Sequence, residues 1–232
     1  MTLPRIGITT SFANGKQMVD QHYIQAVAAA GGLPLIVPML DSENTMAAFL
    51  DLLDGLIITG GPAITQNMIG ALPDDLAPTD PLRTRTDEAV FAAMRNRPVF
   101  GICYGMQFIN AQAGGIIYSD IQAHKPHAIA HSADRGGHDH DVQIDSNSRI
   151  AGIMRREHLV VNSYHIQAVA EVGKGLRAVA FGPDGVIEAL ESEDGRTMGV
   201  QFHPERMGEA GLPLFTAFVD QCRVWHDRRQ PG

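Results

Sequence analysis

Cysteine is scarce in this chain, with two residues among 232. So few thiols cannot build a disulfide framework, and a reducing cytoplasm is therefore the expected compartment. One of the two, Cys222, stands at helical spacing with Phe215, Phe218 and Trp225. This spacing predicts a buried helix face, where free cysteine is common, so we expect no bridge between Cys222 and Cys103.

The chain also lacks an excess of positive charge and long apolar runs. The chain has 18 Lys and Arg against 26 Asp and Glu, a net charge of −8, and no basic run. Such an acidic chain is a poor partner for nucleic acid or for an anionic membrane surface. The first ten residues lack the basic and apolar regions of a secretory signal. The most apolar stretch, at 31–40, has about half the length needed to cross a bilayer, and two prolines interrupt it.

What the chain does have is an ordinary apolar share of 44%, which fits one large α/β domain over residues 1–232. Up to Ile102, short β-rich segments alternate with segments of helical spacing. We expect strands at 5–9, 33–37 (buried), 56–59 and 98–102, helices over 23–28, 46–53 and 87–96, and a loop from 60 to about 85. Asp87 and Glu88 are expected to cap the third helix. The alternation predicts a mostly parallel sheet with helices on both faces.

The second half of the chain has a different character. Short β-like runs at 141–144, 158–161, 176–181, 186–190 and 198–202 predict antiparallel hairpins added to the sheet, and residues 213–225 predict a closing helix. Residues 119–140 show little periodicity and are predicted to form a long surface loop. The histidines at 124, 127, 131, 138 and 140 are interpreted as solvated, since no Cys or well-spaced His/Glu set closes a tetrahedral metal site. The alternatives are an active-site lid or a weak metal site.

The strongest local signal is an apolar strand that runs into Gly101-Ile-Cys-Tyr-Gly105. A nucleophile with small residues two positions to either side is typical of a nucleophile elbow, because larger side chains would collide in the tight turn. The turn places the Cys103 thiol at a helix N-terminus, where backbone N–H groups favour the thiolate. The backbone N–H of Tyr104 would then face a developing oxyanion. The alternative is a buried cysteine in a strand-to-helix crossover.

A second motif, His203-Pro-Glu205, ends the last predicted strand. A catalytic thiol needs a base, and the base needs an acceptor that orients it. His203 and Glu205, two positions apart on extended backbone, point to the same side, and Pro204 restricts the backbone between them. Since His203 lies 100 residues after Cys103, their contact is a prediction about the tertiary fold. His165 is a weaker candidate base, because no carboxylate stands near it in the sequence.

Together the two motifs resemble the class I glutamine amidotransferase-like superfamily. Within it, the chain is most similar to the γ-glutamyl-γ-aminobutyrate hydrolase-like family. The supporting stretches are Arg5-Ile-Gly-Ile-Thr-Thr, Val161-Asn-Ser-Tyr-His-Ile-Gln167 and Pro183-Asp-Gly-Val-Ile-Glu188. The resemblance implies a flavodoxin-like α/β fold and hydrolysis of a γ-glutamyl amide through a glutamyl-thioester. It also implies that no metal or organic cofactor is needed.

The resemblance also implies roles for individual residues. Cys103 would be the nucleophile, His203 the base and then the acid, and Glu205 the group that orients it. The residues implied to bind substrate or to form the oxyanion site are Gly60, Gly61, Tyr104, Gln107, Asn162, Ser163, Tyr164 and His165.

Two positions depart from the family pattern. The hydrolase family usually has arginine after the cysteine, whereas this chain has Tyr104, and Pro62 follows the glycine pair. Both residues are expected at the mouth of the pocket, where the amine leaves. Tyrosine there is commoner in glutaminase domains, so the alternatives are a glutaminase subunit that delivers ammonia to a partner synthase, and a catalytically silent binding protein. A homodimer is compatible with each.

Overall fold

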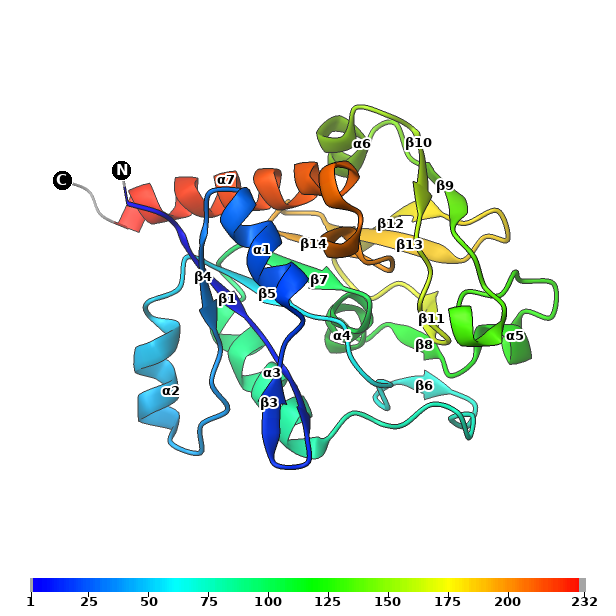
Figure 1. Cartoon of the computed structure of the whole chain (residues 1–232), viewed down its shortest axis with the longest axis horizontal. Coiled ribbons are helices and arrows are strands. Elements are labelled where there is room, and N and C mark those ends of the chain that lie inside the picture. The colour runs from blue at the N-terminus through cyan, green and yellow to red at the C-terminus, as the bar shows by residue number, and fades with distance from the viewer. Residues whose placement is uncertain (1, 230–232) are drawn as a thin grey trace.

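The computed structural model describes residues 2–229, so Met1 and residues 230–232 of the predicted 1–232 domain lie outside the described residues. Its centre is a nine-stranded sheet in the order β10-β9-β12-β13-β14-β7-β5-β1-β4 (Figure 1). The parallel part consists of β1 (Arg5–Ile8), β4 (Leu33–Ile36), β5 (Gly55–Ile58), β7 (Val99–Ile102) and β14 (Thr197–Val200). The antiparallel part consists of β9 (His140–Ile144), β10 (His158–Val161), β12 (Leu176–Phe181) and β13 (Ile187–Ser192).

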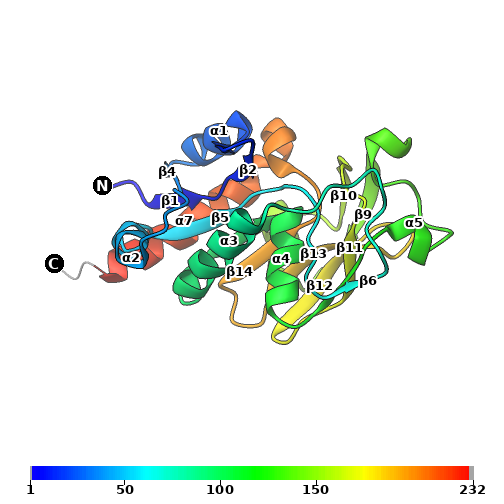
Figure 2. The ribbon, with the colours of Figure 1, turned by 90° about the horizontal axis from the view of Figure 1, so that it is seen from below.

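Helices cover both faces of the sheet, as predicted. On one face α1 (Gln21–Ala29) and α7 (Leu212–Arg229) pack together with α6 (Arg149–Met154). On the other lie α2 (Glu43–Leu50), α3 (Pro81–Met94) and α4 (Tyr104–Gln112), so that α1 stands opposite α3 and α4 (Figure 2). The buried Cys222 of α7 carries a free thiol, as expected. Among residues 2–229, no helix is both long enough and apolar enough to cross a membrane.

Smaller elements surround the C-terminal ends of the parallel strands. A hairpin of β2 (Ser11–Ala13) and β3 (Lys16–Met18) follows β1. A second sheet joins β6 (Met68–Ile69), β8 (Ile116–Tyr118) and β11 (Ala168–Glu171). One short helix, α5 (Ile121–His124), and three 3₁₀ turns (Ala133–Arg135, Pro204–Arg206 and Gly208–Ala210) complete the described chain. These short strands have no periodic signal of their own, and the sequence did not predict them.

Four expectations about the elements are wrong. Helix α3 begins at Pro81, six residues before the predicted start, because Asp80 caps it and Pro81 occupies its first turn. Asp87 therefore lies within the helix and caps nothing. Strand β4 is an edge strand whose residues are half-buried or exposed. Strand β14 pairs in parallel with β7 and so belongs to the parallel core as well as to a hairpin.

The fourth wrong expectation concerns residues 119–140, which are not a solvated loop throughout. His131 and His140 are buried, with exposed fractions of 3% and 8%. His124 ends α5 and stacks on Tyr118 with ring centroids 5.3 Å apart. The segment is held by contacts with distant residues, which local periodicity cannot reveal.

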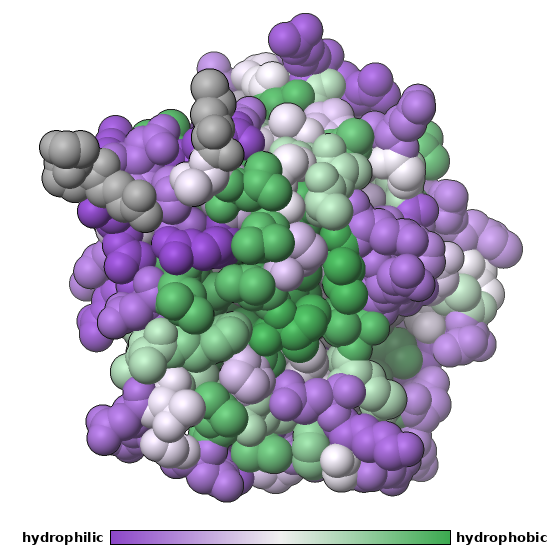
Figure 3. All heavy atoms as spheres, turned by 60° about the vertical axis from the view of Figure 1, so that its left-hand side comes forward, coloured by the Kyte–Doolittle hydropathy of each residue, from purple (hydrophilic) through white to green (hydrophobic). Residues whose placement is uncertain are grey.

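The edge strand β4 carries an apolar surface. Leu33 and Ile36 on this strand are 41% and 40% exposed, and Leu40 and Leu52 on the flanking segments are also exposed. Figure 3 shows apolar residues gathered in the middle of the face that includes this side of the molecule.

Candidate active site

The candidate nucleophile stands between β7 and α4. Cys103 has backbone angles φ 52° and ψ −106°, a left-handed conformation that a non-glycine residue adopts at a cost of order 1–3 kcal/mol. The flanking glycines make the turn possible. A Cβ on Gly101 would lie 2.6 Å from the Gly105 carbonyl carbon, and a Cβ on Gly105 would lie 2.0 Å from the Ile58 carbonyl oxygen. The predicted steric reason for small residues is therefore confirmed, and β5 contributes to it as well as the turn.

Strand pairing brings the second motif to this turn. Because β14 lies beside β7 in parallel register, with Gly199 opposite Gly101, both strands end at the same edge of the sheet. His203 follows β14, and its ring lies near enough to Cys103 for the two groups to interact electrostatically. His203 Nδ1 lies 2.7 Å from Glu205 Oε1. Nδ1 therefore carries the proton, and Nε2 is left free for the thiol.

The three groups are electrostatically coupled. Burial opposes a charge on His203, but the neighbouring Cys103 and Glu205 outweigh it and raise the pKa of His203 to about 10. His203 is thus imidazolium at neutral pH when its sulfur partner is a thiolate. The His203 backbone is fixed by Asn162, whose side chain accepts from His203 N at 2.8 Å and donates to His203 O at 2.9 Å.

Backbone N–H groups near Cys103 could stabilise an oxyanion. The Tyr104 N–H lies in the first turn of α4, directly after the thiol. Of the glycine pair, Gly60 donates its N–H to Tyr23 Oη at 2.9 Å, which leaves Gly61 as the member that can face a substrate. A Cβ on Gly60 would lie 2.8 Å from His203 Cε1, so the loop is also packed against the imidazole of His203.

Cys103 opens onto a cavity of about 150 Å³. Its walls include four of the predicted residues, Gly61, Gln107, Tyr164 and His165, and also Pro62, Asp75, Ser132, Asp134 and Gln167. The side chains of the predicted residues Asn162 and Ser163 do not line this cavity. Asn162 holds His203, as above, and Ser163 donates to the backbone carbonyl of His131 at 2.7 Å. Gln107 does not reach freely into the cavity, since it donates to Gln167 O and Gln201 Oε1.

The expectation that Tyr104 stands at the pocket mouth is wrong for its side chain. The ring is 1% exposed, stacks on Phe108, and lies under the Arg83 guanidinium, with Arg83 Cζ 4.2 Å from the ring centroid. Burial and the charge of Asp87 raise the pKa of Tyr104 above its usual range. Pro62, in contrast, does line the cavity, as expected.

A buried arginine, which the sequence did not reveal, supports the glycine loop, residues 59–61. Arg83 is 0% exposed and donates to Thr59 O at 2.9 Å and to Gly60 O at 3.0 Å. Its Nε donates to Asp87 Oδ2 at 3.2 Å. Burial raises the pKa of Asp87, and Arg83 opposes that shift. No signal could have found Arg83, because its loop partners lie 23 and 24 residues away, outside any local motif.

Gln201 is a second residue that sequence reasoning missed. It is fully buried, and its amide nitrogen lies 3.5 Å from the Cys103 sulfur while its oxygen accepts from Gln107. The signal was available, because Gln201 stands two positions before His203, on the same side of an extended segment.

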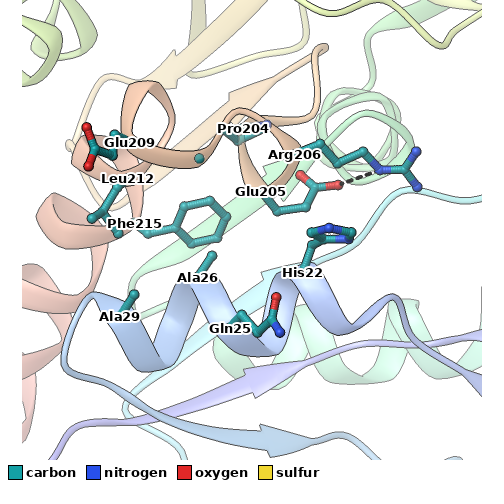
Figure 4. A pocket seen from close by; sticks show the side chains of 11 residues that line it. His22, Gln25, Ala26, Ala29, Pro204, Glu205, Arg206, Glu209, Leu212 and Phe215 are labelled. Atoms are coloured by element: carbon teal, nitrogen blue, oxygen red, sulfur yellow. Dashed lines mark ion pairs between the residues drawn. The ribbon is translucent and has the colours of Figure 1, made fainter.

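Two further pockets adjoin the histidine and its carboxylate. One, of about 230 Å³, is lined by His203, Gly60, Asp20, Arg206 and others, and Gly61 separates it from the Cys103 cavity. The other, of about 370 Å³, lies behind Glu205 between α1 and α7 (Figure 4). In it Glu205 faces Arg206, with 3.8 Å between Oε1 and Nε, while apolar side chains such as Phe215 line the far end.

Known proteins resemble this chain in both sequence and fold. The Peptidase C26 family profile matches residues 4–205. The chain is 34% identical to protein NtpR of Enterococcus hirae, over 94% of this chain and 99% of that one. It is 29% identical to the γ-glutamyl-γ-aminobutyrate hydrolase PuuD of Escherichia coli, over 89% and 87%. A solved Thermoplasma acidophilum protein, described as part of a GMP synthase, superposes with a TM-score of 0.70 at 18% identity, over 99% and 98%, and shares the fold.

Proposed function

This chain belongs to the peptidase C26 family, the glutamine amidotransferase-like hydrolases of C–N bonds, and from that premise we propose that it hydrolyses small γ-glutamyl amides through Cys103. The observation that carries the proposal is the arrangement of Cys103, on its strained backbone turn, with His203 and the carboxylate of Glu205 beside a cavity. PuuD, with a similar sequence, is named for a γ-glutamyl substrate. Family membership also goes against the alternative of a silent binding protein.

The first half of the reaction forms a thioester. The Cys103 thiolate attacks the amide carbonyl, and the resulting oxyanion accepts hydrogen bonds from the N–H groups of Tyr104 and Gly61. His203 then donates its Nε2 proton to the amine nitrogen as the C–N bond breaks. The amine leaves, and the γ-glutamyl group stays on the Cys103 sulfur.

The second half uses the same groups in reverse. His203, now neutral, takes a proton from water as the water oxygen attacks the thioester carbonyl. The C–S bond breaks, glutamate leaves, and the thiolate–imidazolium pair is restored. Throughout, Glu205 accepts a hydrogen bond from the Nδ1–H group of His203 and so keeps Nε2 directed at the reacting atoms.

The two pockets on either side of Gly61 suit the two halves of the substrate. The Cys103 cavity would hold the glutamyl part, and among the described residues Asp134 is a wall carboxylate without an ion pair that could meet its ammonium group. The pocket with Asp20 and Arg206 adjoins His203, the group that protonates the leaving amine. We place the released amine there.

Kinetics with a panel of γ-glutamyl amines and glutamine would test the proposal, with the amine identified by mass. Cys103→Ala should lower turnover by several orders of magnitude. Cys222→Ala is the matched control, because it removes the other buried thiol, which packs against Gly55 at the start of β5, and should leave turnover of the folded enzyme nearly unchanged. Equal activity in wild type and Cys103→Ala would contradict the role of nucleophile.

The second candidate function is a glutaminase subunit that delivers ammonia to a synthase. The fold shared with a protein described as part of a GMP synthase favours it. It predicts weak glutamine hydrolysis by the isolated chain and strong stimulation by a co-purifying synthase. Cleavage of γ-glutamyl amines without a partner, together with pull-downs that recover no synthase, would exclude it.

We infer that the enzyme acts in the cytoplasm, as its low cysteine content suggests.

We also infer that two copies of the chain pair through the apolar edge at β4. An uncovered edge strand offers unpaired backbone groups, and a two-fold pairing of identical edges covers both at once. The exposed Leu33 and Ile36 would be buried in such a dimer.

A further inference from the structure

Three buried histidines surround one buried glutamate next to the active-site cavity. Glu188 Oε1 lies 3.4 Å from His131 Nδ1, 3.4 Å from His140 Nε2 and 3.5 Å from His165 Nε2. All four side chains are at least nine-tenths buried. The ligand atoms of His131, His140 and Glu188 lie within 4.8 Å of one another. They come from the histidine-rich segment, from β9 and from β13, and His165 lies between β10 and β11.

The polar atoms of this cluster are not satisfied by hydrogen bonds. Among residues 2–229, eight buried side-chain nitrogen and oxygen atoms lack a partner, and five of them belong to His140, His165 and Glu188. Buried polar groups without partners cost about 1–3 kcal/mol each, and the cost is larger for charged ones. Such a concentration in one place points to a ligand that these atoms can bind.

Tautomers identify the kind of group. His165 Nδ1 is 3.0 Å from the Gln167 carbonyl, so it carries the proton, and the lone pair of Nε2 faces Glu188. His131 Nε2 is 2.9 Å from Asp184 Oδ2, so its proton is there, and the lone pair of Nδ1 also faces Glu188. Several lone pairs thus converge on one point.

We propose that His131 Nδ1, His140 Nε2 and Glu188 Oε1 bind a divalent transition metal ion, with Zn²⁺ as the first candidate. His165 Nε2, 3.5 Å from Glu188 Oε1, is the neighbour that can move in to complete the coordination. The Zn–N and Zn–O bonds of a tetrahedral site, at about 2.0–2.2 Å, require neighbouring ligand atoms about 3.3–3.5 Å apart. The three His–Glu separations, 3.4, 3.4 and 3.5 Å, match this spacing. Imidazole and carboxylate ligands suit Zn²⁺ and similar ions better than Mg²⁺ or Ca²⁺.

The ring nitrogens of His131 and His165 that face away from Glu188 are hydrogen-bonded to neighbouring oxygen atoms, as is usual for metal-bound histidines. Asp184 orients the His131 ring, and the Gln167 carbonyl orients the His165 ring, as outer partners of metal-bound histidines do. One divalent ion with three neutral imidazoles and the carboxylates of Glu188 and Asp184 gives a net charge of zero. A neutral cluster removes the cost of burying an isolated carboxylate.

The ion would fasten one wall of the substrate cavity. Ser132 and Tyr164, which line the Cys103 cavity, adjoin His131 and His165 in the chain and form an isolated β-bridge with each other. The segment 125–139 contains only one 3₁₀ turn, Ala133–Arg135, so regular backbone pairing does little to hold it. A metal bound here is a structural element that takes no part in the chemistry at Cys103.

The rival account is a metal-free cluster in which a protonated histidine bridges Glu188 and Asp184. Metal analysis separates the two accounts. The protein is prepared on a Cys103→Ala background, so that the active-site thiol cannot bind metal, and is stripped with a chelator. Titration with Zn²⁺ is then followed by elemental analysis, calorimetry and thermal unfolding. We expect one equivalent per chain and a rise in Tm of about 5–10 °C at saturation. Co²⁺ should give the visible spectrum of a tetrahedral site.

Variants locate the ion. Glu188→Gln and His140→Ala should each abolish the stoichiometric binding, while His158→Ala, which removes an exposed histidine on the neighbouring strand β10, should retain it. If the stripped Cys103→Ala protein, with its histidine cluster intact, binds no Zn²⁺ or Co²⁺, the proposal is overturned even if the other variants fail to fold. So would one equivalent of metal retained by folded Glu188→Gln, because the ion would then lie elsewhere.

Discussion

At the scale of single residues, the proposed reaction depends on the charge of His203. Its raised pKa, about 10, depends on the carboxylate of Glu205 as well as on Cys103. Because the folded pKa lies above the unfolded value of about 6.5, this interaction stabilises the fold fully below pH 6.5 and is lost as the pH rises toward 10. The same proton is the one that the leaving amine needs.

We therefore expect kcat/KM to decline on the alkaline side as His203 loses its proton, with an apparent pKa near 10. Glu205→Gln should move this decline to lower pH by about one unit or more, because a neutral amide no longer attracts the imidazolium. The pH profile of kcat/KM with a γ-glutamyl amide measures the shift. An unchanged alkaline limb in the variant would show that Glu205 does not hold the charge on His203.

Gly105 offers a second prediction at this scale. An added Cβ would meet the Ile58 carbonyl oxygen at 2.0 Å, a backbone atom that cannot move aside without displacing β5. Gly105→Ala should destabilise the fold by about 1–3 kcal/mol or more. Gly152→Ala is the matched control, since its Cβ would have no atom within 4 Å and would sit in helix α6. Thermal unfolding of the two variants should differ clearly, and equal Tm values would contradict the steric argument.

At the scale of elements, helix α3 does more than cover the sheet. It inserts Arg83 beneath the glycine loop, residues 59–61, and balances its charge with Asp87 one turn later. Arg83→Met leaves the buried Asp87 without its partner, which should cost about 3–5 kcal/mol of unfolding free energy. Chemical denaturation measures the loss.

The double variant Arg83→Met/Asp87→Leu separates charge balance from loop support. Removing both charges should recover much of the stability, while kcat should stay low because the loop that carries the Gly61 N–H has lost its hydrogen bonds. Full recovery of kcat along with stability would mean that Arg83 does not position this loop.

The elements also show what a sequence can and cannot predict. Strand and helix periods, with the Gly-Ile-Cys-Tyr-Gly turn, predicted the parallel core and the place of Cys103. The meeting of His203 with Cys103 was predicted from the chemistry of the two motifs and not from their spacing, and β14 brings it about by a parallel pairing across about 100 residues. Arg83 and Glu188 could not be predicted as parts of the site, because the loop carbonyls that Arg83 binds and the histidines around Glu188 lie far from them in the sequence. Tyr104 was misplaced because its orientation depends on α3.

At the scale of the whole molecule, substitutions on the two edge strands, β4 and β10, test which edge forms the dimer. Ile36→Lys on β4 should convert a dimer to monomer, because a charge cannot be buried unpaired in the interface. Val160→Lys on β10, the opposite edge and 61% exposed, should leave the oligomeric state unchanged. Light scattering after size-exclusion chromatography gives the mass. A wild-type monomer, or an Ile36→Lys dimer, would contradict pairing through β4.

The parallel pairing of β14 with β7 also determines when the thiol becomes reactive during synthesis. Cys103 leaves the ribosome about 100 residues before His203, which at about 5–20 residues per second is a delay of roughly 5–20 s. Until β14 docks, the cysteine has no base, no carboxylate behind that base and no closed cavity. On the proposed mechanism, a nascent or misfolded chain therefore presents an ordinary thiol, and amide hydrolysis begins only after β14, the last strand along the described chain, has joined the sheet.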